Sequence, residues 1–280
     1  MTGISLQGFT QPSSQACPPL VPSPSTLLLS GFHPFAGDPF NPSGHIAASL
    51  HGHLLLPHIL VRSLILPVSG PPAFRKLSHA IRVHRPRWIV AMGVSSRAEI
   101  SLESTAWNEE DYAQPDNSGR RPRGVSILKR GPLQLHTGFG LSPRDVQKFS
   151  SGLAIRASTD PGRFVCNHLY YRLLHLTRNP QHYSHGKVIF IHLPSTPEMR
   201  RGPCDARFFY PLAPLQEIVR KLLQKVVHLH PDHERISNRD GEIKIPPQLQ
   251  RGRLLPNLNP WILKNLENAF IQHAASGRIV

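Results

Sequence analysis

The segment GKVIFIHLP, residues 186–194, is an apolar run that begins at a glycine and ends at a proline. Its length and its β-branched and aromatic side chains are typical of a strand buried on both faces. Four other runs have the same character: TLLLSGF (26–32), HILVRSLIL (58–66), RWIVAMGV (87–94) and LAIRAST (153–159). Strands of this kind occur in mostly parallel sheets that are covered on both sides by helices.

Helix-like patterns lie between these runs. The expected helices are SGHIAASLHGHLL (43–55), PPAFRKLSHAIRVH (71–84), the segment after Cys166, and PLAPLQEIVRKLLQKVVHL (211–229). Strands that alternate with helices form βαβ units. The sequence therefore predicts an α/β fold, a three-layer α/β/α sandwich with a twisted, mostly parallel central sheet. Residues 101–139 interrupt the alternation. Within them, NEEDYAQPDNSGRRPRG (108–124) is predicted to form a long polar loop, followed by a strand, a turn and another strand over 125–139.

The two ends of the chain differ in composition from its middle. Residues 1–25 contain no charged side chain and are rich in Pro, Ser and Gln, which predicts a disordered extension. Residues 26–230 contain the apolar runs and are predicted to form the folded domain. Residues 231–280 are predicted to be a C-terminal extension with a short amphipathic helix near 261–274. This helix either packs on the domain or serves as an interaction helix.

Composition narrows the class of protein. No run approaches the roughly 18 apolar residues that a membrane-spanning helix needs, and the N-terminus lacks the features of a secretory signal, so we expect a cytoplasmic protein with no membrane partner. The net charge is +15, but the basic residues are scattered, so no specific nucleic-acid partner is predicted. Cys17, Cys166 and Cys204 have no CxxC spacing, which argues against a disulfide framework and a cysteine zinc site.

Two loops follow predicted strands, where open α/β sheets place their sites. SGFHPFAGDPFNPSGH (30–45) contains three phenylalanines that either fill the core or form a flat apolar pocket. GVSSRAEISLESTAWNEED (93–111) is rich in acids, most of which we expect to be solvated. Strand alternation places Glu99, Ser101 and Glu103 on one face, so at least one carboxylate is expected to point toward the site.

A third locus is Cys166, in the stretch GRFVCNHLYYRLLH (162–175). A lone cysteine is ordinarily a small buried apolar side chain. At the start of a helix, however, the helix dipole and the free backbone N–H groups favour a thiolate and can hold an oxyanion. Of the 17 histidines, His192 ends a buried strand at the same edge of the sheet, whereas His168 and His175 share the helix of the thiol without facing it. A Cys, a His and a carboxylate that converge there would form a catalytic triad.

Together these segments resemble the pyroglutamyl-peptidase I family of cysteine peptidases, also called pyrrolidone-carboxylate peptidases, over about residues 26–229. The family motifs GFxPFGGxxxNPS, RxEIxxE, PDN, GxFVCNH and FIHxPxxPE are matched by GFHPFAGDPFNPS (31–43), RAEISLE (97–103), PDN (115–117), GRFVCNH (162–168) and FIHLPSTPE (190–198). The chain departs from the family at His33, Ala36, Ala113 and Gln114, and its GVSSR turn is one residue shorter. We expect these changes to affect substrate affinity or specificity more than the type of reaction.

The resemblance implies a cysteine exopeptidase that removes N-terminal pyroglutamyl residues from peptides through a thioester, with residues 26–230 as its catalytic domain. It implies that Cys166 is the nucleophile, His192 the general base and acid, and Glu103 the residue that orients His192. The implied substrate pocket is formed by Phe32, Phe35, Asn41, Phe164 and Val165. No metal or organic cofactor is implied, the implied partners are pyroglutamyl peptides, and many members of the family form homo-oligomers.

Two alternative hypotheses stay open. One is a pyroglutamyl- or lactam-binding homologue with weak or no turnover, motivated by the altered loops around an intact triad. The other is a basic interaction protein whose terminal extensions bind an anionic partner. A hydrolysis assay tests the first, and deletion of residues 231–280 tests the second.

Overall fold

The computed structural model describes residues 24–139, 154–178, 187–202, 205 and 207–229. The predicted extensions, residues 1–25 and 231–280, lie outside this part of the chain, apart from Pro24 and Ser25. The described helices are α1 (Pro42–Ser49), α2 (Gly70–His84), α4 (Val165–Arg178) and α5 (Leu212–Leu229), with a short 3-10 helix at Pro197–Met199.

Seven strands form the central sheet, in the order β2-β3-β1-β4-β9-β5-β8. Their bounds are β1 (Ser25–Phe32), β2 (Leu54–Leu56), β3 (Ile59–Leu66), β4 (Trp88–Val94), β5 (Ile100–Glu103), β8 (Ile155–Ser158) and β9 (Lys187–Leu193). The four central strands β3, β1, β4 and β9 are parallel, while β2 and β5 run antiparallel to their neighbours β3 and β9. The prediction of a mostly parallel sheet is therefore confirmed.

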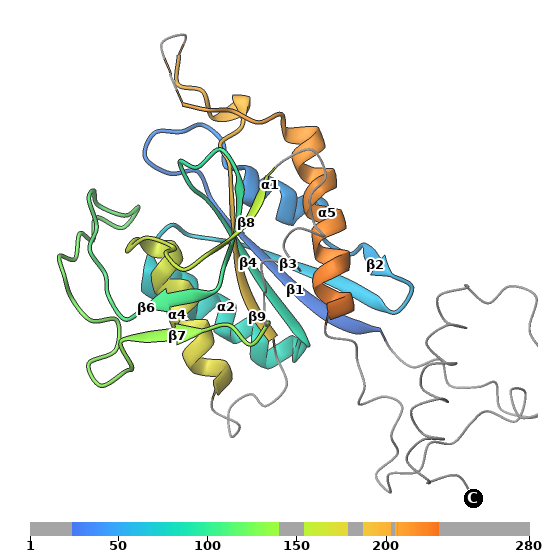
Figure 1. Ribbon diagram of the computed structural model, residues 1–280, viewed down its shortest axis with the longest axis horizontal. Helices are drawn as coiled ribbons and strands as arrows, with labels where there is room; N and C mark the ends of the chain where they lie inside the picture. Colours follow the sequence, from blue (N-terminus) through green and yellow to red (C-terminus); the bar gives the residue numbers. More distant parts are fainter. Residues whose placement is uncertain (1–23, 140–153, 179–186, 203–204, 206, 230–280) are drawn as a thin grey trace, which may run out of the picture. The chain divides into compact units, whose positions relative to one another are not determined.

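Helices cover both faces of this sheet (Figure 1), and an apolar core lies on each face. One core packs α1 and α5 against the sheet, and the other packs α2 and α4 against the opposite face. The continuous apolar runs of the sequence are explained by this arrangement, because both faces of β1, β4 and β9 are buried. The α/β/α sandwich is thus the observed architecture of the described residues.

Two local predictions were wrong. The helix predicted over 43–55 ends at Ser49, because Gly52 adopts a left-handed turn with φ of 78° and Leu54–Leu56 then forms the edge strand β2. The two strands predicted over 125–139 reduce to β7 (Gln134–His136), which pairs with β6 (Thr105–Trp107) in a separate two-stranded sheet. Val125 makes only an isolated bridge to Glu110.

Candidate active site

The site lies where three parallel strands end. β1, β4 and β9 are neighbours in the sheet and end at Phe32, Val94 and Leu193, and the helix α4 begins at Val165. Because parallel strands end at the same edge, the loops that follow them gather there. This topology brings together the phenylalanine loop, the GVSSR turn and the histidine motif.

Cys166 is the second residue of α4 and is half-buried, with a free thiol. A Cβ atom placed on Gly93 would lie 2.8 Å from Cys166 Sγ, so the thiol rests directly on this glycine of β4. Gly93 is the registered partner of His192 on β9. The missing side chain at Gly93 therefore lets the thiol reach the sheet beside His192.

His192 and Glu103 form a buried pair. His192 Nδ1 lies 2.8 Å from Glu103 Oε1, and both side chains are almost completely inaccessible to solvent. β5 runs antiparallel to β9 with Ser101 opposite His192, which brings the end of β5 alongside the imidazole. A carboxylate on Nδ1 directs the other ring nitrogen away from Glu103.

Charge interactions shift the pKa values of this pair. Burial acts to lower the pKa of His192, but hydrogen bonding and charge from Cys166 and Glu103 outweigh it and raise the pKa to about 9. Burial acts to raise the pKa of Glu103, but the interaction with His192, with smaller contributions from Ser158 and Arg97, holds it below its usual value. An ionised Glu103 beside a protonated His192 is therefore the favoured state at neutral pH.

Sequence reasoning missed Arg97, which contacts the glutamate of this pair. Arg97 Nη1 donates to Glu103 Oε1 at 3.0 Å and to Ser101 Oγ at 3.2 Å. Tyr170 donates its hydroxyl proton to the backbone carbonyl of Glu103 at 2.6 Å. Arg97 is the first residue of the RAEISLE motif, but the sequence alone did not indicate that its side chain would contact the Glu103 carboxylate.

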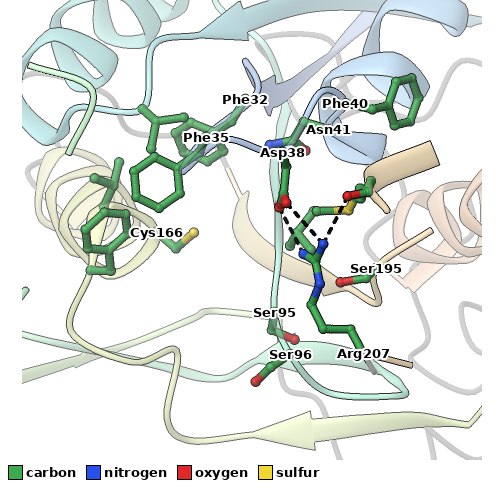
Figure 2. Close-up of a pocket in the computed structure, with 15 residues that line it drawn as sticks. Phe32, Phe35, Asp38, Phe40, Asn41, Ser95, Ser96, Cys166, Ser195 and Arg207 are labelled. Atoms are coloured by element: carbon green, nitrogen blue, oxygen red, sulfur yellow. Dashed lines mark hydrogen bonds and ion pairs between the residues drawn. The ribbon is translucent and has the colours of Figure 1, made fainter. Parts of the chain in front are cut away.

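A cavity of about 210 Å³ opens next to the thiol (Figure 2). Residues from all three loops line it: Phe32, Phe35, Asp38, Phe40, Asn41, Val68, Val94, Ser95, Ser96, Phe164, Val165, Cys166, Ser195, Met199 and Arg207. The rings of Phe35 and Phe164 lie 5.0 Å apart, and Tyr112 supports Phe164 with a ring separation of 4.5 Å. The five predicted pocket residues thus all line one cavity together with Cys166.

The opposite side of the cavity is polar and was not predicted. Figure 2 shows Asp38 and Arg207 paired there, on the other side of the cavity from Cys166. Arg207 Nη1 and Nη2 donate to the two Asp38 carboxylate oxygens at 3.0 and 3.1 Å, and Arg207 also pairs with Asp205 at 2.6 Å. The pair joins the loop after β1 to the segment after β9, which are 169 residues apart. No local sequence pattern indicated this contact.

Two asparagines of the motifs make hydrogen bonds that hold the loop after β1 in place. Asn41 lines the cavity, but its side chain caps α1 by accepting from Ser43 N at 3.0 Å, and it donates to the His33 carbonyl at 3.0 Å. Asn117 of the PDN motif donates to the Pro34 carbonyl at 3.0 Å and so ties the same loop from outside.

The positions that depart from the family motif differ in environment. Ala36 takes a left-handed φ of 55°, where an L side chain is strained and a glycine is not. Ala113 and Gln114 are exposed and do not line the cavity. The shortened turn, in contrast, contributes Val94, Ser95 and Ser96 to the lining.

The other acids of the segment 93–111 form ion pairs and do not line the cavity. Glu99 pairs with Arg156 at 3.0 Å, and Glu109 pairs with Arg163 at 2.9 Å. Glu110 is not among the solvated acids, because it is buried against His168.

Among the residues that the structure describes, no group of three His, Cys, Asp or Glu side chains is arranged to hold a metal ion. None of the helices there is long and apolar enough to cross a bilayer. The predictions on cofactors and on cell compartment stay predictions.

A thiol at a helix N-terminus, next to an imidazole that a carboxylate orients, is the arrangement of cysteine hydrolases. The family model described as pyroglutamyl peptidase matches residues 25–229. The chain therefore belongs to the pyroglutamyl peptidase family, and the predictions of this family and of a hydrolytic enzyme of the peptidase class are confirmed.

Individual relatives agree with this assignment. A pyrrolidone-carboxylate peptidase of Cupriavidus necator is 33% identical over 175 residues, which are 62% of this chain and 80% of the relative. That of Bacillus velezensis is 34% identical over 174 residues, 61% of this chain and 79% of the relative. The crystal structure of pyroglutamyl peptidase I from Bacillus amyloliquefaciens is similar with a TM-score of 0.66 and 28% identity, and the match covers 74% of this chain and 98% of that one.

Proposed function

We propose that this chain is an omega-type exopeptidase that removes N-terminal pyroglutamyl residues from peptides. The observation that carries the proposal is the meeting of the Cys166 thiol with the His192–Glu103 pair beside an aromatic cavity. The ring of an N-terminal pyroglutamyl residue is a small, flat, uncharged lactam. Aromatic walls such as Phe35 and Phe164 can hold such a ring while a few hydrogen bonds recognise its amide group.

In the first half of the reaction, the Cys166 thiolate attacks the carbonyl carbon that links pyroglutamate to the next residue. The backbone N–H groups at the start of α4 stabilise the negative oxygen of the tetrahedral intermediate. His192 gives its proton to the leaving amine as the C–N bond breaks. The products are a pyroglutamyl thioester on Cys166 and a shortened peptide with a free N-terminus.

In the second half, neutral His192 takes a proton from a water molecule, whose oxygen attacks the thioester carbonyl. The C–S bond breaks, pyroglutamate leaves and the thiolate is restored beside protonated His192. Glu103 keeps the imidazole in the orientation that both steps need. The pKa of about 9 supports the role of His192 as the acid of the first half, because the ring carries its proton at neutral pH.

Hydrolysis of pyroglutamyl-aminomethylcoumarin by the reduced, full-length protein tests this function. We expect fluorophore release from this substrate and none from the matched prolyl compound, which lacks the lactam carbonyl. The Cys166→Ser variant should lose the activity by at least a factor of about 1,000. A folded wild-type protein that releases no product would overturn the proposal, and saturable binding of a pyroglutamyl peptide without turnover would support the binding-protein hypothesis instead.

A further inference from the structure

Arg97 links the carboxylate of the site to the loop that leads to the nucleophile. Its Nη1 donates to Glu103 Oε1 at 3.0 Å, and its Nη2 donates to the backbone carbonyl of Asp160 at 2.7 Å. The same Oε1 atom lies 2.8 Å from His192 Nδ1. One carboxylate oxygen is therefore shared between a fixed guanidinium and the imidazole.

The contact at Asp160 continues toward Cys166. The carboxylate of Asp160 accepts from Gly162 N at 3.1 Å and pairs with Arg163 at 2.7 Å. Arg163 directly precedes Phe164 of the cavity wall and lies three residues before Cys166. Arg97 thus contacts both the residue that orients the base and the loop that places the thiol.

We propose, on the basis of the function proposed above, that Arg97 is a positioning residue of the reaction. It holds Glu103 against His192, anchors the loop before α4, and weakens the attraction of Glu103 for the proton on His192. The last effect assists catalysis, because a proton that is held less tightly is transferred more readily to the leaving amine.

The direction of this charge effect follows from the groups that surround the pair. Glu103 faces His192 from β5, Cys166 and the Tyr170 hydroxyl face the pair from α4, and β8 contributes the Ser158 hydroxyl. β4 contributes Gly93, which has no side chain. Besides His192, the positively charged group that contacts Glu103 among the described residues is Arg97, from the turn before β5. Removing this charge should make the carboxylate more attractive to the imidazole proton.

The test compares the pH dependence of two substitutions at this position. Arg97→Gln removes the charge but keeps an amide donor, and we expect kcat to fall about tenfold while KM changes less than about threefold. The alkaline limb of kcat/KM should move up by about one pH unit, because His192 keeps its proton to higher pH. Arg97→Lys keeps the charge, so its alkaline limb should stay at the wild-type position and part of kcat should return, although one ammonium cannot make both contacts.

Arg120→Gln is the matched control. Arg120 contacts the other buried glutamate, Glu110, at 3.2 Å, and its side chain is 37% exposed against 36% for Arg97. We expect this variant to keep the wild-type kcat and alkaline limb. An unshifted limb in Arg97→Gln, or the same shift in both variants, would overturn the proposal.

Alkylation of Cys166 separates this proposal from the peptidase function, because it needs no substrate. The rate of modification by iodoacetamide is followed on the Cys166 peptide by mass spectrometry across pH. We expect the upper inflection of the rate–pH curve to move to higher pH in Arg97→Gln but not in Arg97→Lys. This result supports the effect on the Cys166–His192 pair, even if the wild-type protein releases no product. Full peptidase activity with identical inflections in all variants would overturn the role of Arg97 and leave the peptidase function intact.

Discussion

The described part of the chain contains two buried glutamate–histidine pairs with nearly the same geometry. His192 Nδ1 lies 2.8 Å from Glu103 Oε1, and His168 Nδ1 lies 2.9 Å from Glu110 Oε1. An arginine contacts each glutamate, Arg97 in the first pair and Arg120 in the second. The pair itself therefore does not distinguish a reactive site from a structural one.

The two pairs differ in what surrounds them. Beyond His192 lie the Cys166 thiol and an open cavity. The ring of His168 instead packs on Gly70, where an added Cβ would lie 2.7 Å from the imidazole, and within the described residues its Nε2 has no hydrogen-bond partner. The second pair has neither a thiol nor the cavity beside its imidazole, and we call it the closed pair. It ties the loop of Glu110 to α4.

Helix geometry separates the two environments. Cys166 and His168 are two residues apart on α4, so their side chains leave the helix about 200° apart. Cys166 points to the end of the sheet, while His168 points to Gly70 at the start of α2. One helix thus supplies the thiol beside the first pair and the histidine of the second. In the proposed reaction, the thiol next to the imidazole is what makes the first pair catalytic.

The largest expected difference comes from replacing each histidine by asparagine. His192→Asn should lower kcat/KM on the order of 10,000-fold, because base and acid are both lost. His168→Asn should keep kcat/KM within about threefold but lower the free energy of unfolding by about 2 kcal/mol, because a buried ring is replaced by a smaller group. Steady-state kinetics and urea unfolding measure the two effects. If both variants fold and lose activity equally, the assignment of His192 to catalysis and His168 to stability would be contradicted.

The two glutamates give the second test, through Glu→Gln substitutions. Glu103→Gln should lower kcat/KM at least about 100-fold, because the imidazole loses its orienting charge. Hydrogen bonds to Glu110 from His168, Tyr112 and Arg120 outweigh the opposing effect of burial and lower its pKa to about 2. Glu110→Gln should therefore cost about 3 kcal/mol of stability at pH 7 and leave kcat near the wild-type value.

The pH dependence of stability checks the sign of this effect. A lowered pKa means that ionised Glu110 stabilises the fold above about pH 4.5 and that this contribution disappears as the pH falls toward 2. Urea unfolding of the wild-type protein should lose about 3 kcal/mol from this group over that range. The Glu110→Gln variant should show a correspondingly flatter profile, and parallel profiles would contradict the assignment.

Much of the fold could be predicted because its physical signals are local. Apolar runs bounded by Gly, Pro or Ser correspond to β1, β3, β4 and β9, and their shared edge indicated where the loops would meet. The helix predicted through Leu55 failed because the apolar pattern continues past Gly52 into the edge strand β2. The strand β6 has only three residues, which is too short for alternation to be recognised, whereas β7 lies within the second strand predicted over 125–139.

The site could be predicted only where side chains follow strands or belong to motifs. Glu103 and His192 follow from strand position and resemblance, but Arg97 lies before β5, and the strand pattern did not indicate that its side chain would contact Glu103 six residues later. The pairing of Asp38 with Arg207 joins segments 169 residues apart. Glu110 stood among acids that were expected to be solvated, and its burial depends on the fold of the whole loop.

The smallest test concerns the hydroxyl of Tyr112, which connects the closed pair to the cavity wall. Tyr112 donates to Glu110 Oε1 at 2.6 Å, while its ring supports Phe164. Tyr112→Phe removes only the hydrogen bond, so we expect a loss of about 1.5 kcal/mol in stability, a higher pKa for Glu110 and an unchanged KM.

Tyr171→Phe is the control for this change, because its hydroxyl donates to the neutral carbonyl of Pro132 at 2.7 Å. A neutral acceptor should make this loss smaller, about 0.5 to 1 kcal/mol, and independent of pH between 2 and 5. If Tyr112→Phe instead raised KM strongly at unchanged stability, the closed pair would act on the substrate through Phe164. The Glu110–His168 pair would then have a role in substrate binding through the Tyr112–Phe164 contact, and would not be purely structural.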